Sequence, residues 1–419
     1  MSRPKPVSSL ALVAAALLGA LASCSEPPAP PRPAPSGASR PADPPAAAST
    51  SAATSATASS PQAASPAPPF HVVANLESAA SLHPLAGGAL VLSAAGVLVI
   101  DGDDLTFDPK WQAGLEALRA SPPSGSLVQA GGRFPEGAFV ATIEDAAVPG
   151  GTTSIVYEWS GGRWTKRSKG EDNLAIVGLA PWEGGQTLAV FAGQTRSDMR
   201  FEAFGAAPTP MPQPDLDTGN ALCRALLSPD AFTALPSGEV FVAGTACKPA
   251  EEGYMPMGKV VERWAPGAAR GVVDPLPAPA PLRLTAIVAL ARNDVYVAGG
   301  APDGPARRGP EAPAYLAHFD GARWQPSPLP AEARGELTTI AGGADGKLWA
   351  AIGDALWRRE PDGTWALVPL PPSGEKLATA VSLWVRGPGD VWALRSGPRS
   401  ATLLHTRPLT RAFVPPAKR

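Results

Sequence analysis

Two cysteines in the second half of the chain, Cys223 and Cys247, have the clearest chemistry. A thiol pair about 25 residues apart can close a disulfide, worth roughly 3 kcal/mol in a chain-entropy treatment. Met255 and Met257 follow closely and could instead complete a soft-ligand metal site with the thiols. No histidine lies near these residues in the sequence. We therefore expect a disulfide between Cys223 and Cys247 and no bound metal.

The histidines and carboxylates follow no local catalytic pattern. The four histidines are scattered along the chain: His71, His83, His318 and His405. No HExxH, GxSxG, P-loop or dinucleotide-binding fingerprint occurs. Several carboxylates fall at predicted turns or strand ends, where turn-capping or solvated side chains are usual: Glu158, Asp294, Asp320 and Asp390. The sequence thus predicts no catalytic residue and no cofactor, and it favours a protein that is not an enzyme.

The first 23 residues are typical of an export signal. Arg3 and Lys5 precede the apolar run LALVAAALLGALAS, which is too short to cross a bilayer as a mature helix. The run ends in LASC, which resembles the lipobox of bacterial lipoproteins. The resemblance implies cleavage before Cys24, acylation of Cys24 with palmitate among its acyl chains, and retention on the cell envelope, with Ser25 compatible with the outer membrane. The alternative is an ordinary secretory signal that leaves Cys24 as a free thiol.

Residues 24–69 form a linker with nothing to bury. From residue 25 onward this segment has no Leu, Ile, Val, Phe, Tyr or Trp, and it is rich in Pro, Ala and Ser. Such a composition cannot offset the entropy of ordering the chain, so we expect a disordered tether that spans about 35–40 Å as a coil.

The remainder, residues 70–419, contains a repeat that predicts its fold. A turn followed by a short alternating strand recurs seven times, for example as RNDVYVAGG from Arg292 and GPGDVWALRSG from Gly387. The first apolar residues of these strands are Leu90, Phe139, Leu188, Val240, Val295, Leu348 and Val391. Their separations are 49, 49, 52, 55, 53 and 43 residues. A period of about 50 residues is typical of a repeat architecture.

Each repeat predicts four antiparallel strands. Gly-Gly or Asp-Gly turns followed by Trp, as in SGGRW, DGARW and DGTW, mark the hairpin that leads to the last strand. Sheets of four strands that pack radially bury both faces and leave only short edges exposed. We therefore predict an all-β fold, a seven-bladed β-propeller, with six or eight blades as alternatives. The residues after the anchors grow to Phe241, Tyr296, Trp349 and Trp392, and we expect them to fill space between blades rather than to bind a ligand.

The repeats resemble those of kelch-like and sensor-type periplasmic propellers of bacteria. The best match is ADGKLWAAIGDALWRREPDGTW, residues 344–365. The full kelch pattern of paired glycines with spaced Tyr and Trp is absent, and the first and third copies are degenerate. One helix is also predicted from Asp108, with Trp111, Leu115 and Leu118 on one side, packed between the first two blades.

Two long connections between the second and third strands lie on one predicted face. They are the segments 245–259 and 301–313, in the fourth and fifth blades, and long loops on a rigid scaffold often bind ligands. The candidate contact residues are Tyr254, Met255, Met257, Arg307 and Arg308. In the same frame Cys223 and Cys247 flank one antiparallel pair at the same end, which suits a disulfide.

These features predict a membrane-anchored envelope lipoprotein whose propeller binds a protein or a glycan without catalysis. Removing residues 1–23 changes the formal net charge from −2 to about −4, so no basic surface favours nucleic acid. The alternative is an envelope enzyme that acts on a polysaccharide or a small molecule at the central channel, because propellers also serve as enzyme scaffolds. The sequence does not indicate an oligomeric state.

Overall fold

The computed structural model describes residues 69–411 and 413, with short gaps. The gaps are residues 77–79, 94–95, 108, 121–125, 135, 146–151, 170–173, 194–198, 206–229, 251–252, 269–270, 279–281, 301–313, 373–379, 398 and 412. The chain divides into two units, residues 1–61 and 62–419, and all described residues belong to the second. Among them, no helix is long and apolar enough to cross a membrane.

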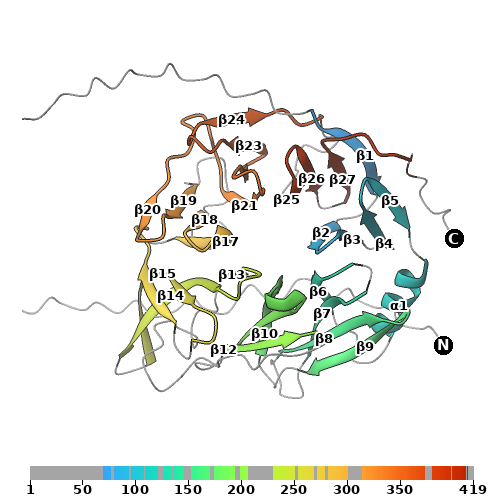
Figure 1. Ribbon diagram of the computed structural model, residues 1–419, viewed down its shortest axis with the longest axis horizontal. Coiled ribbons are helices and arrows are strands. Elements are labelled where there is room, and N and C mark those ends of the chain that lie inside the picture. Colours follow the sequence, from blue (N-terminus) through green and yellow to red (C-terminus); the bar gives the residue numbers. More distant parts are fainter. Residues whose placement is uncertain are drawn as a thin grey trace, which may run out of the picture. The chain divides into compact units, whose positions relative to one another are not determined.

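The described strands form seven antiparallel sheets, which we number as blades in chain order (Figure 1). Blade 1 contains β2 (Ala80–Leu85), β3 (Gly88–Ser93), β4 (Gly96–Asp101) and β5 (Asp104–Phe107). Blade 2 contains β6 (Ser126–Gly132), β7 (Ala138–Asp145), β8 (Thr152–Ser160) and β9 (Arg163–Lys169). Blade 3 contains β10 (Leu174–Pro181), β11 (Thr187–Gly193) and β12 (Met199–Phe204), with the short helix η1 (Glu183–Gly185) between β10 and β11.

The C-terminal blades follow the same order. Blade 4 contains β13 (Ala231–Ala234), β14 (Val240–Ala250), β15 (Gly253–Trp264) and β16 (Val272–Pro275). Blade 5 contains β17 (Arg283–Ala291), β18 (Asp294–Gly300), β19 (Tyr315–Phe319) and β20 (Trp324–Pro326). Blade 6 contains β21 (Leu337–Gly342), β22 (Leu348–Ile352), β23 (Ala355–Arg359) and β24 (Trp365–Val368). Blade 7 contains β25 (Ala380–Gly387), β26 (Asp390–Ser396), β27 (Ala401–His405) and β1 (His71–Leu76).

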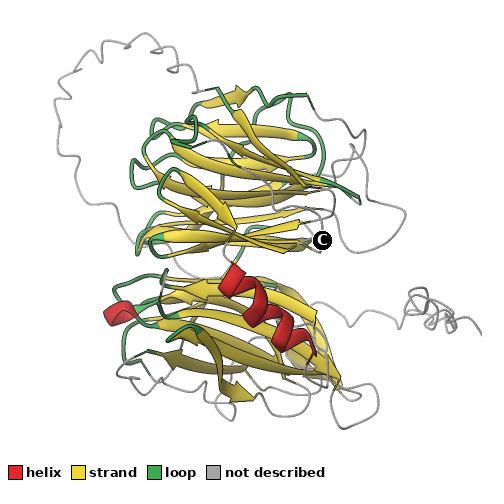
Figure 2. Cartoon of the chain, turned by 90° about the vertical axis from the view of Figure 1, so that its right-hand side faces the viewer, coloured by secondary structure: helices red, strands yellow, loops and turns green. Residues whose placement is uncertain are grey.

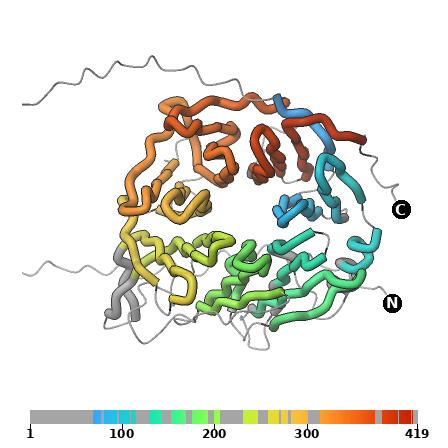
Figure 3. The backbone as a smooth tube through the Cα atoms, in the orientation of Figure 1, coloured from blue at the N-terminus to red at the C-terminus, as the bar shows by residue number. Residues whose placement is uncertain are grey.

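The first strand of the domain closes the ring. β1 pairs with β27, from His71 opposite His405 to Leu76 opposite Ala401, and so forms the outer strand of the last blade (Figure 3). The inner strands of neighbouring blades contact one another all the way round, including β2 of blade 1 with β25 of blade 7. The prediction of a seven-bladed propeller is therefore confirmed, although blade 3 has three strands among the described residues.

The ring has two distinguishable faces. In an antiparallel meander the turns from strand 1 to 2 and from strand 3 to 4 lie at one end, and the turn from strand 2 to 3 lies at the other. We call the first end the lower face and the second the upper face. Because His71 pairs with the lower end of β27, the chain enters the propeller at the lower face.

The seven anchor residues of the repeat lie on the second strands and are all buried, with exposures of 0–2%. The aromatic residues that follow them pack against the next blade, as predicted. Trp392, which is 0% exposed, packs among residues of blade 1, and Trp349 packs among residues of blade 7. Likewise, Phe241 belongs to a cluster with blade 5 and Tyr296 to one with blade 6. These side chains fill the seams between blades.

The predicted helix is α1 (Pro109–Ala120), at the perimeter of the ring (Figure 2). Trp111 is buried and stacks on Trp159 of blade 2, with ring centroids 4.9 Å apart. The Gln112 side-chain oxygen accepts a hydrogen bond from the Val97 N–H of blade 1 at 2.9 Å. The helix therefore joins the first two blades, as expected. The side chains of Leu115 and Leu118 lie outside the described part of the helix.

The segment 245–259 differs from the prediction of a loop. β14 and β15 pair continuously, apart from one bulge, up to Ala250 opposite Gly253, so the described residues of the segment form a two-stranded β-ribbon. Its content of Pro and Gly suggested a loop, but proline is tolerated in a strand where its nitrogen points away from the partner strand. The flanking strands pair only with the base of this ribbon, at residues 240–243 and 260–263.

Candidate functional site

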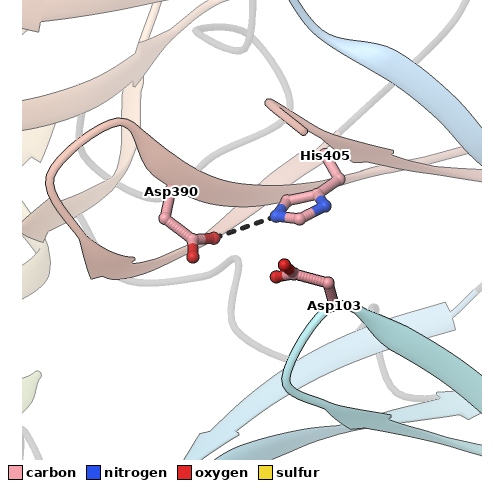
Figure 4. A group of neighbouring side chains, drawn as sticks. All are labelled: Asp103, Asp390 and His405. Atoms are coloured by element: carbon pink, nitrogen blue, oxygen red, sulfur yellow. Dashed lines mark hydrogen bonds and ion pairs between the residues drawn. The ribbon is translucent and has the colours of Figure 1, made fainter. Parts of the chain in front are cut away.

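A cluster of two carboxylates and an imidazole lies where the last blade meets the first. One potential ligand atom from each of Asp103, Asp390 and His405 falls within 4.8 Å of the others, and no other such group occurs among the described residues (Figure 4). Asp390 begins β26 and His405 ends β27, whereas Asp103 lies in the turn between β4 and β5. All three positions are on the lower face, so the cluster spans the seam between blades 7 and 1.

His405 is held from several directions. It is 0% exposed and stacks on Trp392, its neighbour across the sheet, with ring centroids 3.9 Å apart and the rings 13° from parallel. Its Nε2 lies 2.9 Å from Asp390 Oδ1. Burial lowers the pKa of His405, although Asp390 opposes this shift, so the ring is neutral at pH 7 and Nε2–H donates to the carboxylate. Nδ1 is buried and has no hydrogen-bond partner among the described groups.

Arg386 bridges the two carboxylates. It occupies a β-bulge of β25, between Val385 and Gly387, and bulges redirect a side chain from its regular position. Its guanidinium donates to Asp390, with Nε 2.7 Å from Oδ2, and forms an ion pair across the seam with Asp103. Burial alone would raise the pKa of Asp390, but hydrogen bonds from His405 and Arg386 outweigh it and the pKa is lowered. Asp390 is therefore ionised at neutral pH.

The charges within this cluster balance. Arg407 also approaches Asp390, at 3.4 Å between Nη1 and Oδ2, so two guanidinium groups face two carboxylates. A divalent cation would have to displace Arg386 from both of its partners. His405, being fully buried, cannot touch a substrate. The geometry thus describes an ion-pair clamp across the seam between blades 7 and 1.

The chain after β27 covers the same seam. The Thr406 hydroxyl accepts from the Val391 N–H at 2.9 Å and donates to the Gly389 carbonyl at 2.8 Å. Further along, the Thr410 hydroxyl donates to the Asp104 carboxylate of blade 1 at 2.9 Å. The C-terminal segment therefore reinforces the contact between the last blade and the first.

Blade 5 contains a second copy of the same arrangement. Asp294 begins β18, Tyr296 follows two residues later, and His318 lies opposite Tyr296 on β19. His318 Nε2 is 2.8 Å from Asp294 Oδ1, and its ring stacks on Tyr296 at 4.4 Å. The similarity between RNDVYVAGG and GPGDVWALRSG thus extends to a histidine on the third strand. A pair that recurs with the repeat is part of the blade architecture.

The predicted contact residues fall into two groups. Tyr254, Met255 and Met257 lie on β15, in the ribbon that projects from the upper face. Arg307 and Arg308 lie outside the described residues, as does Cys24.

The predicted disulfide stays a prediction. Cys247 lies on β14, next to its bulge, but Cys223 is outside the described residues.

The carboxylates predicted at turns behave as structural residues. Asp320 Oδ1 accepts hydrogen bonds from the Ala322 and Arg323 N–H groups, both at 2.9 Å, and these bonds lower its pKa. Glu158 forms an ion pair with Arg167.

Sequence reasoning missed the grouping of Asp103, Arg386, Asp390 and His405. The signal that could have revealed part of it is the Asp-x-aromatic pattern followed by His, shared by blades 5 and 7.

Comparison with known proteins shows no family for this chain. No protein-family model and no curated protein matches the chain. Among solved structures, it is similar to the extracellular domain of BT4673 from B. thetaiotaomicron, with 11% identity and a TM-score of 0.47 over 80% of this chain and 39% of that one.

Two further solved structures are similar. YCF48 from Cyanidioschyzon merolae gives 12% identity and a TM-score of 0.48 over 80% of this chain and 98% of that one. The GH74 xyloglucanase from Xanthomonas campestris gives 14% identity and a TM-score of 0.42 over 80% of this chain and 55% of that one. At these identities the likeness concerns the fold alone.

Proposed function

We propose that this chain is an envelope lipoprotein, anchored through Cys24, whose propeller binds a protein or glycan partner without catalysis. The observation that supports it most is the state of its acid-base groups. The cluster of Asp103, Asp390 and His405 is ion-paired across the seam between blades 7 and 1, and two of its three members, Asp390 and His405, are buried. A scaffold of this kind presents surface to a partner rather than reactive groups to a substrate.

The ribbon of blade 4, residues 245–259, belongs to the two longest strands among the described residues. β14 and β15 are 11 and 12 residues long, whereas β22 and β23 of blade 6 have 5 each. At its base, Lys259 Nζ donates to Asp230 at 2.8 Å and to Thr245 at 2.9 Å. The ribbon is therefore anchored firmly where it leaves the sheet.

The direction of the ribbon also suits a tethered binding protein. It leaves the upper face, because it joins the second and third strands, while the chain enters at the lower face through Phe70, which is 6% exposed and packs edge-on against Trp349. A tether attached to one face leaves the opposite face free for a partner.

Binding is tested with the anchored chain and two variants. In the first variant, residues 246–258 are replaced by an Asn-Gly turn, which favours a tight hairpin. In the second, the turn Gly161-Gly162 on the lower face is replaced by Asn-Gly as a matched control. We expect chemical crosslinking in envelope preparations, and a glycan array, to show a ligand that the first variant loses and the second retains.

Three results would contradict the proposal. They are equal binding by both variants, the absence of any ligand, and turnover of a polysaccharide by the purified chain. The anchor is tested separately with Cys24→Ala, which we expect to release the protein from the membrane fraction.

A further inference from the structure

Buried histidines lie at both seams of blade 1. His83 on β2 is 7% exposed and faces blade 2, where its Nδ1 accepts a hydrogen bond from the Ala130 N–H of β6 at 3.2 Å. Its Nε2 is 2.8 Å from the Ser81 hydroxyl, to which it donates. On the other side of blade 1, His405 of blade 7 lies in the cluster with Asp103 described above. His83 thus bonds across the seam with blade 2, and His405 lies beside the seam with blade 7; both rings are neutral at pH 7.

The hydrogen-bond geometry at His83 excludes the protonated ring. Protonation at Nδ1 would set its N–H against the N–H of Ala130, and the buried amide would lose its acceptor. Among the described residues, no carboxylate contributes to the pKa shift of His83, which is due to burial. The strands packed most closely against β2 are β3, β6, β25 and β26. β3 and β6 carry no titratable side chain, and the other two contribute Arg386, Asp390 and Arg395, none of which bonds to His83.

Protonation of His405 is also costly, though less so. The groups that face it are Asp390 and Asp103, with Arg386 and Arg407 paired to those carboxylates, and β1 adds His71 opposite it. Asp390 would stabilise an imidazolium through Nε2. The second proton, on Nδ1, would have no acceptor among the described groups in a site that is fully buried.

Among the described residues, the seams of blades 4 to 6 contain no buried histidine. Arg263 of blade 4 lies over the Phe319 ring of blade 5 at 4.5 Å. Arg359 of blade 6 donates to the Tyr296 hydroxyl of blade 5 at 3.0 Å, and the Thr285 hydroxyl donates to the Leu337 carbonyl at 2.7 Å. His318, near the same seam, is partly exposed.

We propose that blade 1 is an acid-sensitive element of the ring, released from blades 2 and 7 when His83 and His405 become protonated, while the seams of blades 4 to 6 stay closed. This inference does not depend on the proposed binding function. It predicts that the contacts of blade 1 with its two neighbours are the first in the ring to open at low pH.

Hydrogen exchange of the whole chain at pH 7.5 and pH 5, corrected for intrinsic rates, tests the proposal, because exchange reports the free energy of local opening. Burial lowers the pKa of His83 from 6.5 to about 4. This difference predicts a roughly 30-fold larger opening constant at pH 5 for peptides that cover β2 and β6. We expect a smaller increase of the opening constant for β26 and β27. For β17, β18, β21 and β22 we expect no increase.

The variant His83→Asn isolates the cause. The Asn side-chain oxygen can still accept from Ala130, but it does not titrate, so we expect the acid response of β2 and β6 to disappear. His71→Asn, at an exposed position of β1, is the control and should keep the response. An equal loss of protection in all blades, or an unchanged response in His83→Asn, would overturn the proposal. If that variant does not fold, the comparison of seams in the natural protein decides.

Discussion

Replacing Arg386 with Met should weaken the ring at its closure point. The variant removes the guanidinium that joins Asp103 of blade 1 to Asp390 of blade 7 but keeps the aliphatic part of the side chain. The side-chain exposures are 24% for Arg386, 35% for Asp103 and 5% for Asp390. Removing one partner of a fully buried pair costs about 3–5 kcal/mol, and of an exposed pair about 0–1 kcal/mol. The intermediate burial of this pair predicts about 2 kcal/mol.

The assay is thermal unfolding at pH 7, with Arg407→Met as the matched control. An unfolding entropy of about 2.1 cal/mol/K per residue over roughly 350 residues converts 2 kcal/mol to a decrease in Tm of about 3 °C. Arg407 also approaches Asp390, but its side chain is 48% exposed and the distance is 3.4 Å, so we expect a loss below about 0.5 kcal/mol.

The effect should also depend on pH in a defined direction. The pKa of Asp390 is lowered in the folded protein, so its contribution to stability is present above the ordinary aspartate pKa, about 3.9, and is lost as pH falls below that value. The difference in Tm between Arg386→Met and the natural protein should therefore shrink below about pH 4. Equal destabilisation by Arg386→Met and Arg407→Met would refute the clamp. So would a rise in the Tm of the natural protein with added divalent cations, which would indicate a metal site.

Two further substitutions test the packing of the ring. Gly132→Ala should lower the free energy of unfolding, measured with denaturant, by at least about 2 kcal/mol more than Gly137→Ala. Both glycines have positive φ, but only a Cβ at Gly132 would meet backbone, because it would lie 2.3 Å from the Gly137 carbonyl oxygen. Similar losses of stability in the two variants would show that this contact relaxes. Trp392→Ala should lower the free energy of unfolding by about 3–5 kcal/mol, because Trp392 is 0% exposed between blades 7 and 1. Trp365→Ala, at a half-buried position, should cost clearly less in the same measurement. Equal losses would contradict the role of Trp392 in filling the seam.

The sequence by itself determined the blades. Alternation with period two, ended by Gly-containing turns, is local information, and each anchor residue from Leu90 to Val391 therefore lies on a second strand as predicted. The large residues after the anchors could be predicted to fill the seams because a blade has two apolar faces and only neighbouring blades can cover them. The same local rules predicted a loop for the ribbon of blade 4, because proline is unfavourable in most strands. The prolines are tolerated there because the tip of the ribbon pairs on one side only.

Only the tertiary structure decided which distant residues meet when the ring closes. Arg386 and Asp103 are 283 positions apart and touch because blade 7 returns to blade 1. No periodicity in the sequence links them, and the bulge that redirects Arg386 toward blade 1 is a property of paired backbones. The grouping of His405 with Asp103 likewise depends on closure. Contacts between the first and last blades depend on the orientations of all the blades between them. A short segment of the sequence therefore cannot predict these contacts.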